Sequence, residues 1–441
     1  MKRGIIFTLA ATLLLGALAA IAIFSKTGHG RPSPVHASQA GTKAQSVAGM
    51  VVVRSLTSPK LGPLLNRYCG VSAITVARNG DVWIAGRHGV DVFRAATGTW
   101  ERFSPDDALP SQRLIAESGD GRIWALGLGD RVSYLDERGW HSAQAPPLSA
   151  ALMRHYRGYV NYTPFTDPTA MFATPSGAFI LVRDDGILVY DAGAWRRVVP
   201  PAQVAREYDG LAPPSVKGEV QLTRWQVRTY ATVANLRHIG VTLTQPPGPL
   251  PETYCGAVAA DGSVWLGTDR AAVRVDLSNG TWQMYPLPAG IAQAAACYQS
   301  HDGLIWVADK IGDAATLDAA IGHWVVYNLY ELMPPDSAPR REPQTGPPSM
   351  DIDPRLGAPP SKPYPRQEQN SLSTGAIYED ATGRMLFGVQ MGLAVFDPRN
   401  EKCEFFDSSN SAVQGSVTCF ATDRAGQIWM GIAGGILILQ P

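Results

Sequence analysis

The chain has 441 residues, and its 38 Lys and Arg residues balance its 38 Asp and Glu residues, so it carries no formal net charge. This balance argues against nucleic acid as the main partner, because neutralisation of phosphates drives such binding. Only 17% of the residues are charged, while 44 Gly and 34 Pro supply many turns. This composition fits a fold of many short strands and argues against a charge-rich or disordered chain.

An export segment opens the chain. Lys2 and Arg3 precede an apolar run from Gly4 to Phe24, which is typical of a secretory signal peptide. A run of about 20 residues is also long enough to span a bilayer, so residues 1–24 are predicted to be either a cleaved signal or a retained helical anchor. The leading positive charges place the rest of the chain outside the cytoplasm. We expect a periplasmic or extracellular protein, secreted or anchored, with a flexible linker over residues 25–48.

A short phrase recurs from residue 79 to the end of the chain. It reads small-Gly-x-apolar-Trp-x-Gly, and a polar turn and a second apolar run follow it. The seven copies have their first Gly at Gly80, Gly121, Gly177, Gly262, Gly303, Gly383 and Gly426. The shortest spacing is 41 residues, the length of a four-stranded propeller blade. We therefore predict an all-β, seven-bladed β-propeller over residues 49–441. The Trp of five copies, replaced by Ile180 and Leu386 in the two weaker ones, is predicted to pack between adjacent blades.

The first copy can be divided into all four strands of a blade. They are predicted over Ser72–Arg78, Val82–Ala85, Val90–Arg94 and Thr99–Phe103. The last copy lacks an outer strand, whereas Val51–Thr57 is a strand without a partner ahead of the first blade. Pairing Val51–Thr57 with Ile436–Leu439 would close the ring and remove an exposed edge.

Three insertions interrupt the blades, at residues 142–168, 200–252 and 329–372. We place them after the outer strands of the second, third and sixth blades, so all three leave one face of the ring. Residues 200–252 could hide an eighth blade, because Gly218 is in phase with the repeat. However, Pro213 and Pro214 fall where its inner strand should lie, and Pro cannot donate to a central ladder. We favour seven blades, and we expect the eleven prolines of the third insertion to make it polyproline-like or disordered.

Charged residues gather in the turns between second and third strands, on the same face as the insertions. The candidate ligand-binding residues are Arg87, His88, Asp130, Arg131, Asp184, Asp185, Asp269, Arg270, Asp309 and Lys310. A ring of mixed charge around a funnel could bind a small polar ligand. The alternative interpretation is that these are ordinary, solvated turn residues.

The first insertion contains a second candidate site, a partner-binding loop that mixes cations with aromatics. Its residues are Arg154, His155, Tyr156, Arg157, Tyr159 and Tyr162. Tyr and Arg are favoured in the energetic centres of interfaces. The same loop could instead pack its aromatics down as a cap on the propeller.

Searches for catalytic, cofactor and metal motifs find none. The chain has no G-x-S-x-G, no H-E-x-x-H and no P-loop, so we expect no cofactor and no metal, and we favour a non-catalytic protein over an enzyme. The five cysteines are Cys69, Cys255, Cys297, Cys403 and Cys419. An odd number leaves at least one thiol unpaired in an exported protein. We favour buried apolar cysteines over a disulfide, such as one from Cys69 to a neighbouring blade.

The phrase DGxVWxGTxxG, followed by VxVD and a G-x-W/F strand, resembles the two-component regulator propeller repeat. Asp261–Tyr285 is the fullest copy, and Asn79–Phe103, Asp120–Trp140 and Thr382–Phe406 depart from it slightly. The resemblance implies a seven-bladed, extracytoplasmic, ligand-sensing domain of a kind often fused to a membrane span and a kinase or cyclase module. The sequence ends inside the last blade, so we expect no transmitter module to follow.

From the residues and the resemblance together, we expect a non-catalytic exported propeller. It would bind a ligand or protein partner on its elaborated face, as a sensor or scaffold for a separate envelope or signalling protein. The alternative is a propeller enzyme of lyase or hydrolase type with its site in the central funnel. The streptogramin lyase family has a similar propeller, but no catalytic His/Glu set can be assigned to this sequence.

Overall fold

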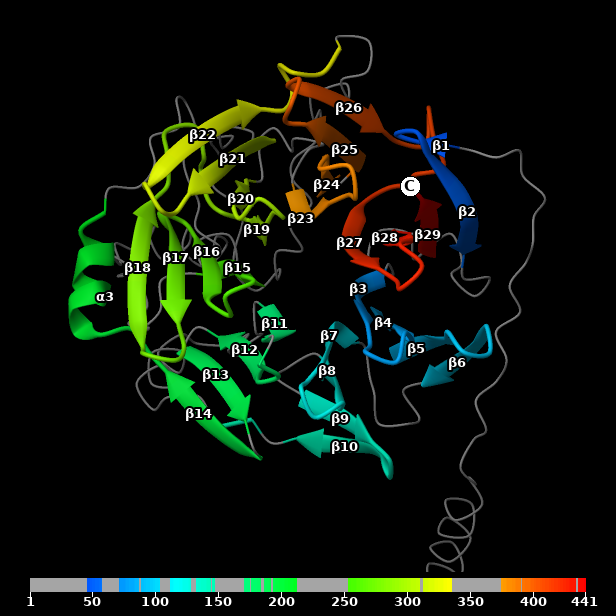
Figure 1. Ribbon diagram of the computed structural model, residues 1–441, viewed down its shortest axis with the longest axis horizontal. Helices are drawn as coiled ribbons and strands as arrows, with labels where there is room; N and C mark the ends of the chain where they lie inside the picture. Colours follow the sequence, from blue (N-terminus) through cyan, green and yellow to red (C-terminus); the bar gives the residue numbers. More distant parts are fainter. Residues whose placement is uncertain are drawn as a thin grey trace, which may run out of the picture.

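The computed structural model describes residues 46–57, 71–86, 89–103, 112–127, 132–143, 145–146, 170–174, 176–183, 186–191, 193–211, 253–309, 312–334, 374–389, 391–433 and 435–441. They form seven antiparallel sheets arranged radially around a central channel (Figure 1), which confirms the predicted seven-bladed propeller. The predicted signal or anchor over residues 1–24 lies outside the described residues. Within the described ranges, no helix is long and apolar enough to cross a membrane.

In six of the blades the four strands follow one another in chain order from the channel outward. Blade one is β3 (Val71–Val76), β4 (Val82–Gly86), β5 (Gly89–Arg94) and β6 (Thr99–Phe103). Blade two is β7 (Gln112–Glu117), β8 (Ile123–Gly127), β9 (Val132–Asp136) and β10 (Gly139–Ala143). Blade three is β11 (Ala170–Ala173), β12 (Phe179–Arg183), β13 (Gly186–Asp191) and β14 (Ala194–Val198).

The next three blades repeat the plan. Blade four is β15 (Thr253–Val258), β16 (Val264–Thr268), β17 (Ala271–Asp276) and β18 (Thr281–Pro286). Blade five is β19 (Ala296–Gln299), β20 (Ile305–Ala308), β21 (Asp313–Asp318) and β22 (His323–Asn328). Blade six is β23 (Thr374–Glu379), β24 (Met385–Val389), β25 (Gly392–Asp397) and β26 (Lys402–Phe406). The third insertion therefore follows the fifth blade, not the sixth as predicted. Five copies of the phrase precede it, and each copy builds one blade.

The seventh blade joins the two ends of the described chain. Its first three strands, counted from the channel outward, are β27 (Val417–Thr422), β28 (Ile428–Ile432) and β29 (Gly435–Gln440). Strand β2 (Met50–Thr57) pairs with β29 as the outer strand. The register runs from Val51 opposite Gln440 to Thr57 opposite Gly435, which confirms the predicted ring closure. A short strand β1 (Ser46–Val47) extends the sheet. Strand structure thus begins inside the segment predicted to be a flexible linker, and Val47 is fully buried.

The repeated phrase builds the hairpin between the inner and second strands. The first Gly of every copy has a φ between +78° and +94°, a backbone conformation that only Gly adopts without steric cost. The Gly therefore sets the turn, and the apolar residues after it enter the second strand of the blade. These second strands are the most buried strands of the fold.

Seven apolar clusters fill the spaces between consecutive blades, and each contains the residue three positions after the first Gly of one phrase. Trp83, Trp124, Trp265, Trp306 and Trp429 are at most 3% exposed, and each packs against the following blade. Ile180 and Leu386 take the same place in the two copies without Trp. The predicted interblade role of this position is confirmed, because a sheet buried on both faces needs a bulky apolar side chain there.

Blades three and four are direct neighbours, so no eighth blade lies between them. A Cβ added at Gly256 on β15 would meet the Ala170 side chain and the Phe172 ring on β11. The start of the second insertion instead forms an eight-residue helix, α3 (Ala202–Asp209), which lies at the edge of the ring (Figure 1).

Candidate functional site

Three of the ten candidate funnel residues lie among the described residues: Asp269, Arg270 and Asp309. The other seven, Arg87, His88, Asp130, Arg131, Asp184, Asp185 and Lys310, lie outside the described residues. The same is true of the whole candidate partner-binding loop, Arg154, His155, Tyr156, Arg157, Tyr159 and Tyr162.

Asp269 and Arg270 hold helix α3 against blade four. The buried Tyr208 hydroxyl of α3 donates to Asp269 Oδ1 and to Thr268 Oγ1, the latter at 3.1 Å. Burial and the adjacent Asp269 carboxylate raise the pKa of Tyr208 far above its usual range, so the phenol stays protonated and acts as a donor. The guanidinium of Arg270 lies over the Tyr208 ring, 5.6 Å from its centroid, and donates to the Leu211 carbonyl at 3.2 Å.

Asp309 shapes the turn that follows β20 in blade five. Its side chain is completely buried and accepts hydrogen bonds from the backbone N–H of Gly312 at 2.9 Å, Asp313 at 3.0 Å and Ala292 at 3.3 Å. Asp309 and Asp269 thus lie on neighbouring blades, and each is bonded within its own surroundings. Of the described funnel residues, Asp309 holds the backbone of its own turn, whereas Asp269 and Arg270 hold the start of the second insertion. The spacing of turn residues in the sequence does not reveal these roles.

All three insertions have at least one end fixed to the propeller. At the first, buried Arg183 of blade three donates to the Pro146 carbonyl at 2.9 Å. The second begins with α3, held as described above. The third begins with Leu329 and Met333, which are buried in the cluster between blades five and six. Because each described stem leaves from an outer strand toward the next inner strand, the three stems lie on one face of the ring.

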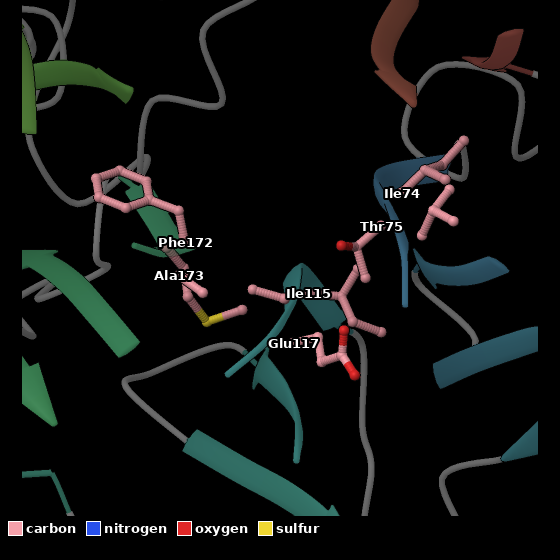
Figure 2. Close-up of a pocket in the computed structure, with 9 residues that line it drawn as sticks. Ile74, Thr75, Ile115, Glu117, Phe172 and Ala173 are labelled. Atoms are coloured by element: carbon pink, nitrogen blue, oxygen red, sulfur yellow. The ribbon is translucent and has the colours of Figure 1, made fainter. Parts of the chain in front are cut away.

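A cavity of about 360 Å³ lies in the channel between the inner strands of blades one, two and three. Its lining residues are Ile74, Thr75, Val76, Ile115, Ala116, Glu117, Met171, Phe172 and Ala173. Figure 2 shows Ile115 of blade two between Phe172 of blade three and Ile74 of blade one. These residues lie toward the turns into the second strands, at the end of the channel away from the insertions. Sequence reasoning did not select them, because they read as ordinary inner-strand residues.

Glu117, at the cavity, belongs to a set of interblade bonds at the same end of the channel. Its carboxylate accepts a hydrogen bond of 2.7 Å from the backbone N–H of Arg78 in the preceding blade. The last inner-strand residue repeats this bond in two further blades, where Ala260 donates to Gln299 and His301 donates to Glu379, each at 2.6 Å. The signal is a polar residue four positions before the Gly of the phrase, and its role is to join adjacent blades.

Aromatic rings on the inner strands of blades five, six and seven lie next to one another. Tyr298 of blade five lies 6.0 Å from Tyr378 of blade six, which in turn stacks on Phe420 of blade seven at 5.8 Å. Burial raises the pKa of Tyr298 to about 12, so its phenol remains neutral. These three rings thus connect the inner strands of three consecutive blades. In the described part of the chain, no group of three or more His, Cys, Asp or Glu side chains is placed to hold a metal ion.

Comparison with known proteins identifies the fold. No family model matches the chain, and no curated protein matches it in sequence. The virginiamycin B lyase of Staphylococcus aureus superposes with a TM-score of 0.51 at 14% identity, over 84% of this chain and 95% of the lyase. The extracellular domain of BT3049 from B. thetaiotaomicron, assigned to a hybrid two component system, gives 0.52 at 15% identity, over 85% of this chain and 39% of that one.

A third similar structure is YCF48 from Cyanidioschyzon merolae, with a TM-score of 0.52 at 11% identity, over 85% of this chain and 96% of YCF48. Sensor domains, YCF48 and a lyase thus share one architecture. At these identities the likeness concerns the fold alone, and a fold of this kind serves several functions. The chain is a seven-bladed β-propeller that is structurally similar to the propellers of two-component sensor domains.

Proposed function

We propose that this protein is an exported, non-catalytic binding propeller of the two-component regulator type. It acts as a sensor or scaffold for a separate envelope or signalling protein, which binds the face that bears the insertions. The observation that carries the proposal is that all three insertions leave that one face and begin at anchored stems.

The anchoring supports binding because it fixes where the insertions emerge. An insertion that is merely tolerated needs no attachment beyond the backbone, since surface loops lengthen at small thermodynamic cost. Here one stem uses buried Arg183, a second uses buried Tyr208, and a third uses the Leu329 side chain. Loops on a rigid repeat scaffold commonly carry the binding residues, and anchored stems reduce the entropy that a partner must remove.

Two further lines support a protein partner. The first insertion contains the Arg- and Tyr-rich segment from Arg154 to Tyr162, a composition favoured in interfaces. A propeller of the same architecture, YCF48, is known bound to the D1 peptide, so a ring of this kind accommodates a polypeptide. The apolar segment at residues 4–24 supports export to the compartment where envelope partners lie.

Site-specific photo-crosslinking in the native envelope tests the proposal. A benzophenone amino acid is placed at Tyr156 or at Tyr159 of the full chain, and at His301 as the matched control. The His301 side chain is 76% exposed and lies at the turn between β19 and β20, on the opposite face. We expect one discrete adduct with an envelope protein from positions 156 and 159 and none from 301.

Alanine replacement provides the second arm of the test. The changes Arg154→Ala and Tyr156→Ala should each reduce the adduct formed from position 159 at least fivefold, because hot-spot residues carry a large share of binding energy. Equal adducts from both faces, or adducts only from position 301, would show that the partner does not bind the insertion-bearing face.

A further inference from the structure

Two cysteines meet in the seam between blades four and five. Cys255 lies on inner strand β15, and Cys297 lies on inner strand β19 of the next blade. Both are free thiols in the structure, and Cys297 is near enough to Cys255 to raise the pKa of its thiol. The Cys255 thiol also donates to the Ala294 carbonyl at 3.3 Å, and Cys297 Sγ lies 4.0 Å from the Trp265 carbonyl of blade four. Each sulfur therefore faces the other blade.

The backbone around the pair leaves room for the two sulfurs. Cys255 is opposite Gly267 in the sheet register, and a Cβ at Gly267 would overlap the Cys255 sulfur. Gly267 thus creates the space that the thiol occupies. Cys297 packs at the edge of the apolar cluster between these two blades.

The repeat provides an internal comparison at the seam between blades seven and one. Cys419 corresponds to Cys255, since both lie seven residues before the Gly of their phrase and opposite a Gly, here Gly431. At the position of Cys297, six residues before that Gly, blade one carries Ile74. Cys419 and Ile74 belong to one apolar cluster. The same geometry is therefore apolar at one seam and a pair of facing thiols at the other.

We propose that Cys255 and Cys297 form a disulfide bond that links blade four covalently to blade five when the protein meets a disulfide oxidant. One cysteine thiolate attacks the oxidant and forms a mixed disulfide, releasing the oxidant's first thiol. The second cysteine then attacks its partner's sulfur, forms the S–S bond and expels the second thiol. The protein loses two protons and two electrons, and the oxidant is reduced to two thiols.

Burial raises the pKa of Cys255 well above the ordinary thiol value, and the neighbouring Cys297 raises it further. Since the thiolate is the reactive form, the bond should form more slowly than between exposed cysteines. Once formed, it is shielded from solvent reductants by the same packing. These properties are those of a structural cross-link rather than of a rapidly exchanging pair.

Peptide mapping of the full chain provides the test. The reduced protein is incubated with oxidised glutathione, quenched with N-ethylmaleimide and digested. We expect alkylatable thiols to fall from five to three, and a cross-linked peptide to join Cys255 with Cys297. The variant Cys297→Ser should retain four alkylatable thiols, whereas the matched variant Cys419→Ser should still lose two, falling from four to two.

The mapping on the unaltered chain decides the matter even if a variant fails to fold. Recovery of both cysteines as separate alkylated or glutathionylated peptides, under oxidation that converts a reference dithiol fully, would overturn the proposal. A cross-link from either one to Cys69 would overturn it as well.

Discussion

Three Trp residues of the repeated phrase differ in the hydrogen-bond partner of the indole N–H. Trp429 donates to Asp423 Oδ2 at 2.9 Å and Trp124 donates to Ser118 Oγ at 2.9 Å. The indole N–H of Trp83 is buried and has no hydrogen-bond acceptor among the described residues. All three rings are at most 2% exposed. Replacement by Phe therefore removes a similar apolar volume at each site but a different hydrogen bond.

The expected losses of unfolding free energy follow from these partners. A hydrogen bond to a charged group contributes about 1.5–3 kcal/mol and a neutral one about 1 kcal/mol, while an unpaired buried donor costs about 1–3 kcal/mol. Asp423 is half-buried and keeps hydrogen bonds from the backbone N–H of Ala425 and Gln427, so the lower end applies to it. Trp429→Phe should therefore destabilise the protein more than Trp83→Phe by about 2.5–4.5 kcal/mol, with Trp124→Phe between them.

Denaturant unfolding followed by far-ultraviolet circular dichroism measures these differences, since the backbone signal does not depend on the Trp that is removed. The midpoints at a common slope give the order of stability. A double-mutant cycle with Asp423→Ala isolates the Trp429 bond from the loss of ring volume. If Trp83→Phe proves as destabilising as Trp429→Phe, the assignment of an unpaired indole at position 83 is wrong.

Two further predictions concern named side chains. Tyr208→Phe removes the hydroxyl that donates to Asp269 and Thr268. Since a buried group left unpaired costs about 1–3 kcal/mol, amide hydrogen exchange in residues 202–209 should accelerate about tenfold. Unchanged exchange there would show that α3 does not depend on this bond. For Asp380, burial opposes ionisation, but hydrogen bonds from Thr382 and Arg384 outweigh it and lower the pKa below 3.8. A carboxyl whose pKa is lower in the folded than in the unfolded state stabilises the fold at pH values above the unfolded pKa, and this contribution is lost as the pH falls through the folded pKa. The difference in unfolding free energy between the unaltered chain and Asp380→Asn should therefore narrow below pH 3.8. A difference that stays constant from neutral pH into that range would contradict the assignment.

The blades could be predicted from sequence because each unit is specified locally. Strand Thr99–Phe103 was predicted with the bounds that the structure shows, and the strand at Val51–Thr57 was assigned its partner from the missing outer strand alone. Turn glycines and period-two alternation act within one blade, so the sequence of a single copy is enough to predict its strands and turns. Seven copies then make the closed ring the arrangement that buries every sheet face.

Helix α3 and strand β1 could not be predicted, because contacts distant in sequence stabilise them. An eight-residue helix is marginal alone, and α3 depends on Tyr208 reaching Asp269, 61 residues away. The two residues of β1 show no alternation, and Ala48 beside them accepts a hydrogen bond from Arg384 across 336 positions. For the same reason the sequence identified Asp269 as a turn residue but did not reveal which side chain it binds.

Ring closure makes β2, a strand near the start of the described chain, wait for β29 near its end. Until residues 435–440 leave the ribosome, β2 has no neighbour to pair with on β29. The incomplete chain is then an open arc, with the apolar side of blade six around Leu386 and that of blade one around Ile84 both lacking their covers. Bringing ends so distant in sequence together is slow. Synthesis of β29 is therefore required before the ring can close, and a chain cut short before residue 435 keeps two apolar blade faces exposed.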